Sequence, residues 1–136
     1  MDAASARDFI RVNHRAVLAT TRADGRVQLS PVLATIDTDG FVVVSTRETA
    51  IKTRNLRRNG YVTLVAFSDR FFGDWVQIEG HAQLVSLPDA MDGLVEYFRS
   101  ISGEHSNWDD YRSAMVREQR LLIRIPIEQA GPSVAG

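Results

Sequence analysis

Residues 16–32 read Ala16-Val17-Leu18-Ala19-Thr20-Thr21-Arg22-Ala23-Asp24-Gly25-Arg26-Val27-Gln28-Leu29-Ser30-Pro31-Val32, and this stretch decides the fold. Its first six residues are small, apolar or β-branched and predict a strand. The Asp24-Gly25 pair is a strong hairpin signal. Residues 27–36 predict the return strand, in which Pro31 indicates an edge or a bulge because proline has no N–H to donate. The stretch therefore predicts an antiparallel hairpin.

Further strands are expected along the rest of the chain. Residues 37–40 predict a turn, and the run Phe41-Val42-Val43-Val44-Ser45 is apolar enough for a strand covered on both faces. Residues 61–67, 75–84 and 121–127 predict three more strands. The tail from Glu128 to Gly136 is expected to be loose.

Helices are expected between these strands, and cap and stop signals give their predicted limits. They lie at residues 5–13, from a Thr49 N-cap to Asn59-Gly60, from Pro88 onward, and from a Ser106–Asp109 capping box onward. Trp108 and Tyr111 on the last helix are interpreted as core or interface anchors. This order of elements predicts a mainly β fold, an antiparallel β-barrel with peripheral α-helices.

The composition narrows the class of protein. A chain of 136 residues without a linker or repeat predicts one domain over residues 1–136, with its core at about residues 16–127. A formal net charge of −1 argues against a general nucleic-acid binder. The absence of cysteine excludes disulfides and thiol catalysis. No segment suits a signal peptide or a membrane span, so a cytoplasmic location without a membrane partner is expected.

Lys52 is the only lysine in the chain, and it begins the basic segment Lys52-Thr53-Arg54-Asn55-Leu56-Arg57-Arg58 directly after an apolar strand. A helix that begins there has unpaired N–H groups and the positive end of its dipole at Lys52. A phosphate or carboxylate can bind at such an end. We therefore predict an anion site at Lys52, helped by Ser45, Thr46 and Arg47. The alternative is a solvated basic helix held by salt bridges.

Two other segments are candidates for binding a flat ring. On the strand of residues 28–32, Gln28, Ser30 and Val32 point to one side, and the polar side chains among them could offer hydrogen bonds to a heteroaromatic ring. An ordinary half-solvated strand is the alternative. The loop with Phe71, Phe72 and Trp75 could form the wall of a ring pocket or a subunit interface. Core packing is the other interpretation of that loop.

Several kinds of catalytic site are missing from the sequence. His14, His81 and His105 lack the spacing of metal ligands, so no metal site is predicted. No serine lies in a nucleophile elbow, and no glycine-rich phosphate loop is present. An anion site without a nucleophile, a metal or paired acids fits a reaction carried by a cofactor. The catalytic residues are left unassigned.

Four motifs together resemble a known group of proteins. The hairpin of residues 16–32 and the segment 52–58 are similar to the opening hairpin and the phosphate-contacting segment of the pyridoxamine 5'-phosphate oxidase-like, FMN-binding split β-barrels. Glu79-Gly80-His81-Ala82-Gln83-Leu84 and residues 103–112 resemble the actinobacterial deazaflavin-dependent (F420-dependent) reductases of that fold. The similarity runs from about Ala16 to Ile127.

The resemblance implies a homodimer of split barrels that binds coenzyme F420 at the subunit interface, with FMN as the alternative cofactor. Lys52 would contact the cofactor phosphate, and Trp75 and Gln77 would approach from the partner subunit. Close relatives often have arginine where this chain has Ala50, and Arg47 is the candidate replacement. The implied cofactor-binding residues are Lys52, Ser45, Thr46, Asn55, Gln28, Ser30, Pro31, Val32, Trp75 and Gln77.

The function implied is that of an F420H2-dependent oxidoreductase, a reductase that transfers hydride to an electron-poor small molecule of the enone, quinone or tetrapyrrole type. Two alternatives stay open. One is an FMN-binding flavin reductase or a pyridoxamine-phosphate-oxidase-like enzyme. The other is a non-catalytic F420 carrier or binding protein.

Overall fold

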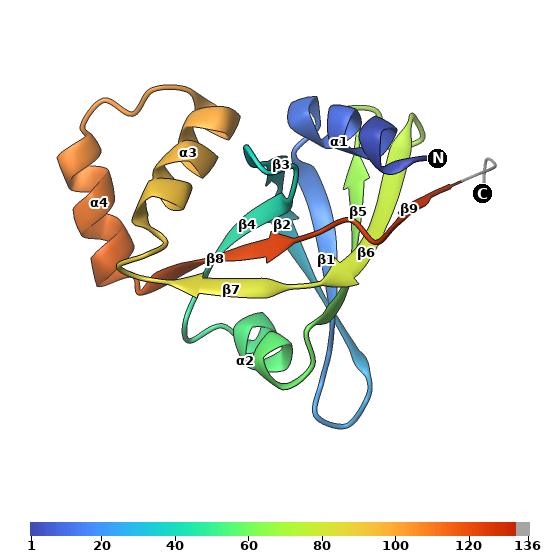
Figure 1. The fold of residues 1–136 in the computed structure, drawn as a ribbon, viewed down its shortest axis with the longest axis horizontal. Coiled ribbons are helices and arrows are strands. Elements are labelled where there is room, and N and C mark those ends of the chain that lie inside the picture. The colour runs from blue at the N-terminus through green and yellow to red at the C-terminus, as the bar shows by residue number, and fades with distance from the viewer. Residues whose placement is uncertain (133–136) are drawn as a thin grey trace.

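The computed structural model describes residues 1–132 as two antiparallel sheets with helices around them (Figure 1). The five-stranded sheet has the order β2-β1-β5-β6-β9 and the four-stranded sheet the order β3-β4-β8-β7. The strands are β1 (Arg15–Thr21), β2 (Val27–Leu33), β3 (Thr35–Ile36), β4 (Val42–Arg47), β5 (Tyr61–Phe67), β6 (Trp75–His81), β7 (Gln83–Ser86), β8 (Arg120–Ile125) and β9 (Gln129–Gly131). The helices are α1 (Ala3–Val12), α2 (Ile51–Arg58), α3 (Met91–Ser102) and α4 (Trp108–Arg117).

The predicted hairpin is confirmed. Strands β1 and β2 pair antiparallel from Arg15 opposite Leu33 to Thr21 opposite Val27. Gly25 in the turn has φ of +85°, a backbone conformation that glycine adopts without strain. Strand β2 is the edge strand of its sheet, so Pro31 lies at an edge, as its missing N–H requires.

Two predicted strands are each divided between the two sheets, and on this point the prediction is wrong. Residues 27–36 divide at Ala34 into β2 and β3, and residues 75–84 divide at Ala82 into β6 and β7. The Ala34 N–H donates to the His14 carbonyl and the Ala82 N–H to the Gly60 carbonyl, both at 2.8 Å. Backbone groups therefore stay paired while the chain bends from one sheet into the other, which is how two packed sheets form a corner.

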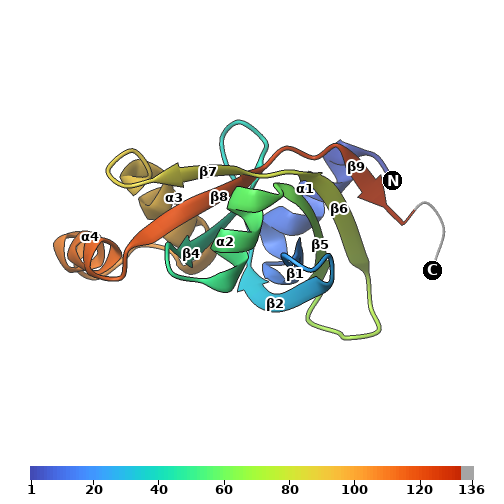
Figure 2. The same cartoon turned by 90° about the horizontal axis from the view of Figure 1, so that it is seen from below.

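The core has two parts, one on each face of the four-stranded sheet. Val42 and Val44 lie in a cluster between the two sheets, whereas Val43 lies in a second cluster beneath α3 and α4. The prediction that this strand is covered on both faces is confirmed. Helices α1 and α2 lie at opposite ends of the space between the sheets, and Figure 2 shows α2 in front of α1 when the molecule is seen from below.

The helix starts differ from the prediction: α1 begins at Ala3 rather than at Ser5, and α3 begins at Met91 rather than at Pro88. The N-cap of α2 is Ala50 rather than Thr49; it has no side-chain hydrogen bond, and the Thr53 hydroxyl donates instead to the Arg47 carbonyl at 2.6 Å. The N-cap of α4 is Asn107 rather than Ser106, and its side-chain oxygen accepts the Asp110 N–H at 3.1 Å. Asparagine and serine are similarly good caps, so the sequence alone did not place this start to one residue.

The end of the chain is more ordered than expected. Residues Gln129–Gly131 form β9, which pairs with β6 and covers that edge of the five-stranded sheet. The prediction of a loose tail is therefore wrong for these residues, because an open strand edge offers unpaired backbone groups to whatever segment follows. Residues 133–136, also part of that prediction, lie outside the described residues.

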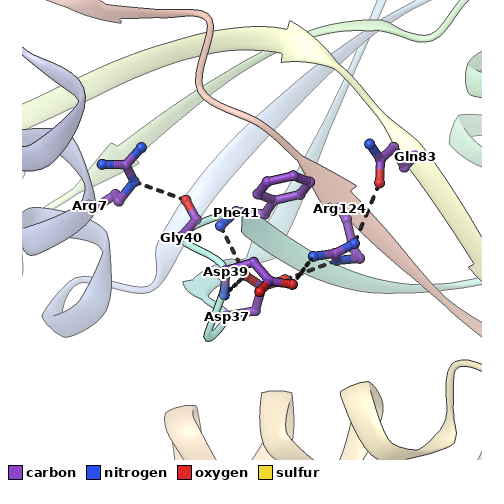
Figure 3. Close-up of polar contacts among 7 residues, drawn as sticks. All are labelled: Arg7, Asp37, Asp39, Gly40, Phe41, Gln83 and Arg124. Atoms are coloured by element: carbon purple, nitrogen blue, oxygen red, sulfur yellow. Dashed lines mark hydrogen bonds and ion pairs between the residues drawn. The ribbon is translucent and has the colours of Figure 1, made fainter.

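The turn before β4 is fixed by Arg124 of β8 (Figure 3). The Arg124 guanidinium donates to Asp37 and to Asp39, each at 2.9 Å, and lies 4.3 Å from the centre of the Phe41 ring. On the other side of the turn, Arg7 of α1 donates to the Gly40 carbonyl at 3.0 Å. These contacts confirm the predicted turn and give its acidic side chains a structural role.

The outer face of the five-stranded sheet carries no helix or strand within residues 1–132. Exposed and half-buried residues alternate along β2, and Val27, Leu29 and Leu33 are exposed apolar side chains on this face. The opposite face of the same sheet contributes Leu18, Leu64 and Ile78 to the core. An open sheet face with this many apolar side chains is typical of an interaction surface.

We predict that Gly80→Ala destabilises the fold. A Cβ atom at Gly80 would lie 2.1 Å from the Pro126 carbonyl oxygen, where the chain crosses from β8 to β9. Overpacking of this kind lowers the free energy of unfolding by about 1–3 kcal/mol. The matched control is Gly60→Ala, whose Cβ would lie 3.4 Å from its nearest neighbour. Urea unfolding of both variants measures the difference, and equal midpoints would contradict the crossing geometry.

Candidate functional site

Lys52 is a half-buried cation at the start of α2. Its side chain makes neither a hydrogen bond nor an ion pair with any residue in 1–132. Burial, and then the positive charge of Arg120, lower the pKa of the Lys52 ammonium group. The free protein therefore holds a charge that its surroundings disfavour, and an anion bound beside Lys52 would reverse this effect.

The rest of the basic helix behaves differently. Arg57 donates to Glu48 at 2.5 Å, and Arg58 donates to the Thr21 carbonyl at 3.0 Å, so both serve as structural contacts. Arg54 and Arg58 lie on the predicted shared face and line a hollow of about 410 Å³ together with Arg22 of the β1–β2 hairpin. The alternative of a basic helix held by salt bridges is thus correct for Arg57. For Lys52 the interpretation as an anion site remains.

Two arginines at the strand ends lie near Lys52 and share one carboxylate. Arg47 of β4 is opposite Arg120 of β8 in the sheet. Arg120 donates to Glu118 at 3.0 Å, and the Arg47 guanidinium lies 3.8 Å from the same carboxylate. Glu118 therefore gives both arginines a partner of opposite charge, which Lys52 does not have among residues 1–132.

Asn55 connects the predicted phosphate segment to the predicted ring strand. Its side chain is 3% exposed, and its amide nitrogen donates to the Thr20 hydroxyl and to the Gln28 side-chain oxygen, both at 3.1 Å. Arg58 donates to the Asn55 amide oxygen at 2.8 Å. Both amide hydrogens are in use, so Asn55 positions Gln28 and α2 and has no hydrogen left for a ligand.

Three further predicted residues lie on the inner side of the fold with Gln28. Ser30 and Val32 are half-buried on the same face of β2, and Thr46 is 3% exposed on the inner face of β4. Ser45 is on the opposite face of β4 because successive residues of a strand alternate. The structure thus brings Gln28 and Asn55 into direct contact and separates Ser45 from Thr46.

Pro31, Trp75 and Gln77 are on the other side of the five-stranded sheet. The strand register places Gln77 opposite Val65, Val65 opposite Val17, and Val17 opposite Pro31, so these side chains share the outer face. Within one chain they are separated from Gln28 and Ser30 by the thickness of the sheet. They can join the same site only through a second protein molecule.

The aromatic loop continues this outer face. Phe71 is 74% exposed and Phe72 is 95% exposed, so core packing is the wrong interpretation of these two residues. Phe71 stacks on Phe67 of β5, with the ring centres 6.0 Å apart. A ring-pocket wall and a subunit interface are the interpretations that remain.

A cleft of about 670 Å³, which no sequence pattern indicated, lies between α3, α4 and the ends of β4 and β8. Ser45 and Arg120 form its wall toward Lys52, and Phe98, His105 and Tyr111 form its aromatic side. Its volume is within the range of small-molecule sites, about 300–1,000 Å³. The helical spacing of Phe98, Trp108 and Tyr111 was a signal for aromatic packing, but only the fold shows that the packing borders a cleft.

Two tyrosines of this region are held by backbone carbonyls. Tyr97 donates to the Leu33 carbonyl at 2.8 Å, at the end of β2, and Tyr111 donates to the Leu94 carbonyl at 2.6 Å. Burial raises the pKa of Tyr97, and burial raises the pKa of Tyr111 to about 12. Both hydroxyls therefore stay protonated at neutral pH and serve as structural donors.

Within residues 1–132 no group of histidine, aspartate and glutamate side chains is arranged to hold a metal ion. No helix in that range is both long enough and apolar enough to cross a membrane.

Comparison with known proteins agrees with the two-sheet fold described above. The family model described as pyridoxamine 5'-phosphate oxidase matches residues 3–132. A conserved hypothetical protein of Mycobacterium tuberculosis superposes with a TM-score of 0.78 at 23% identity, covering 100% of this chain and 93% of that one. An F420 reductase superposes with a TM-score of 0.71 at 16% identity over 92% and 94% of the two chains. The heme storage protein HutZ of Vibrio cholerae gives a TM-score of 0.71 at 17% identity over 94% and 92%.

The fold is a split β-barrel of the FMN-binding type, and the expected fold class is confirmed. The chain belongs to the pyridoxamine 5'-phosphate oxidase family.

We predict that Lys52→Met does not lower the stability of the cofactor-free protein. The variant removes a half-buried, unpaired charge, so its free energy of unfolding at pH 7 should equal or exceed that of the wild type. Because folding lowers the pKa of Lys52, the unfolded chain binds more protons between the folded and unfolded pKa values, and wild-type stability rises with pH there relative to the variant. Urea unfolding at pH 7 and in the alkaline range measures both effects.

The matched control is Arg57→Met, which removes an exposed ion pair with Glu48 and should lower stability by about 0.2–1 kcal/mol. A loss of stability in Lys52→Met as large as in the control would mean that Lys52 has a structural partner.

Proposed function

We propose that the protein is an oxidoreductase that binds coenzyme F420 at a dimer interface and transfers hydride to an electron-poor small molecule. The observation that carries the proposal is the half-buried charge of Lys52, unpaired among residues 1–132, on the helix that Asn55 joins to Gln28 on the inner face of β2. Membership of a family of flavin-type cofactor proteins and the likeness to an F420 reductase support it.

The residues present fit a flat heteroaromatic cofactor with an anionic arm. Lys52 would bind the phosphate through a charge-assisted contact, and Ser45 would offer a hydroxyl from the cleft side. Gln28, held by Asn55, would hydrogen-bond the ring together with Ser30, while Val32 would pack against it. When bound, the cofactor supplies the hydride, and the chain supplies orientation and a partly dry surface.

A homodimer formed through the outer face of the five-stranded sheet is part of the proposal. The exposed apolar residues Val27, Leu29 and Leu33 lie on that face and would be buried by a second copy. Dimerisation would also bring Trp75 and Gln77 of one protomer toward the cofactor of its partner. The exposed Phe71 and Phe72 would extend the same interface.

FMN is the second candidate cofactor, because the family model that matches the chain is that of an FMN-type oxidase. The same lysine would bind the FMN phosphate. A non-catalytic carrier is the third candidate, and the likeness to a heme storage protein gives it support. Equilibrium binding of F420 and FMN in parallel separates the first two, and turnover with a panel of quinones and enones separates an enzyme from a carrier.

We predict that Lys52→Ala weakens F420 binding about ten- to a hundredfold, since a charge-assisted contact contributes about 1.5–3 kcal/mol. The control Arg57→Ala, on the same helix but paired with Glu48, should change affinity less than twofold. Fluorescence titration of the purified variants with F420 measures both. Equal affinity of Lys52→Ala and wild type would remove Lys52 from the site.

We predict that Leu29→Glu dissociates the dimer. The substitution places a charge among the apolar side chains of β2 on the outer face, where Leu29 is 66% exposed in the single chain. Val116→Glu is the matched control, because Val116 is 60% exposed on α4, away from that face. Sedimentation velocity should show a monomer for the first variant and a dimer for the second. A dimer in both would place the interface elsewhere.

A further inference from the structure

Helices α3 and α4 lie next to each other (Figure 1), and aromatic rings form one wall of the cleft beside them. The Phe98 ring lies 5.0 Å from the His105 ring and 5.1 Å from the Tyr111 ring, centre to centre. Trp108 supports the group from behind, 5.7 Å from His105. Rings held against one another on several sides keep their orientation, so the wall is fixed before a ligand arrives.

Several polar groups of the cleft already have hydrogen-bond partners. The hydroxyls of Tyr97 and Tyr111 donate to backbone carbonyls, and Arg120 is paired with Glu118. The exception on the aromatic wall is His105. Its Nδ1 accepts the backbone N–H of Asn107 at 2.9 Å, so in the neutral ring the hydrogen is on Nε2. Nε2 has no hydrogen-bond partner among residues 1–132.

The cleft also borders the proposed cofactor site on two sides. Arg120 and Ser45 line it at the end where the charge of Arg120 reaches Lys52. Tyr97 lines it as well, and its hydroxyl is bonded to Leu33 at the end of the strand proposed to lie along the cofactor ring. A ligand in the cleft would therefore lie beside the charged arm and close to the end of the strand proposed for the ring.

We propose that this cleft is the site of the hydride acceptor and that His105 Nε2–H donates to a carbonyl oxygen of that acceptor. The inference rests on the proposed function. The chemical class is a flat bicyclic quinone: the aromatic wall matches its rings, and the histidine matches its oxygen. The quinone gains one hydride at one oxygen, the π electrons move through the ring to the opposite oxygen beside His105, and a proton from water completes the hydroquinone. When bound, the reduced cofactor would supply this hydride and would lose two electrons with it.

Equilibrium binding of menadione to the cofactor-free protein, measured by calorimetry, tests the location. The chain has no cysteine, so the quinone cannot form a thiol adduct. Ser113→Trp fills the cleft from an exposed position on α4, and Arg112→Trp adds the same side chain at the neighbouring exposed position outside the lining. We expect at least a tenfold loss of menadione affinity in the first variant and less than a twofold change in the second. Equal affinities in the two would overturn the location.

Two substitutions of His105 test its role. His105→Phe keeps a ring against Phe98 but removes the N–H, and should weaken menadione binding about five- to tenfold. His105→Gln keeps a donor and should recover most of that loss, a result that a purely structural role would not give. Equal weakening by both variants would overturn the hydrogen bond.

F420 titration of the same proteins separates this inference from the proposed function. Ser113→Trp should bind F420 with wild-type affinity. If the wild type binds no F420 while menadione binding still responds to Ser113→Trp, the proposed function fails and the quinone cleft stands. If F420 binds and menadione binding ignores Ser113→Trp, the cleft assignment fails alone.

Discussion

The buried side chain of Asn55 is the contact on which the arrangement of the candidate site depends. It joins α2 to both strands of the β1–β2 hairpin, through Thr20 and Gln28, and it accepts from Arg58 on its own helix. A buried amide with unsatisfied groups is costly, so this network fixes the distance between helix and hairpin. The start of α2 is thereby held where Lys52 lies near the end of β4 and the start of β8.

The charge of Lys52 differs from the charges around it. The neighbouring arginines have partners: Arg57 has Glu48, and Arg47 and Arg120 share Glu118. Lys52 has burial and a positive neighbour, which lower its pKa. A half-buried cation without a partner among residues 1–132 destabilises the free protein, and this state fits a site that binds an anion. A cofactor phosphate is the anion that we propose for this position.

Local signals in the sequence predicted much of the fold. The Asp24-Gly25 turn, the apolar run at Val42–Val44 and the stop of α2 at Asn59 need only neighbouring residues, and all are present. The divisions at Ala34 and Ala82 could not be predicted, because the apolar pattern continues through both while the change of sheet depends on distant strands. Strand β9 was missed for the same reason: its pairing with β6 is decided by an open edge, not by its own composition.

The candidate site divides in a similar way. Lys52 stands out in the sequence because it is the only lysine and lies at a helix start. That it has no partner among residues 1–132 could be seen only in the structure. The contact between Asn55 and Gln28 joins residues 27 positions apart, and the α3–α4 cleft brings Ser45 together with His105. Sequence spacing could not reveal either arrangement, nor that Pro31, Trp75 and Gln77 face away from Gln28 on the other side of the sheet.

Because the chain has a single lysine, the proposed binding of the cofactor's anionic arm by Lys52 can be tested directly. Protein labelled with nitrogen-15 in lysine alone gives one side-chain ammonium signal, and its pH titration reports the Lys52 pKa with and without F420. The account predicts a pKa below the ordinary lysine value in the free protein and a rise when F420 saturates the site. A signal whose pKa and chemical shift do not respond to saturating F420 would contradict it.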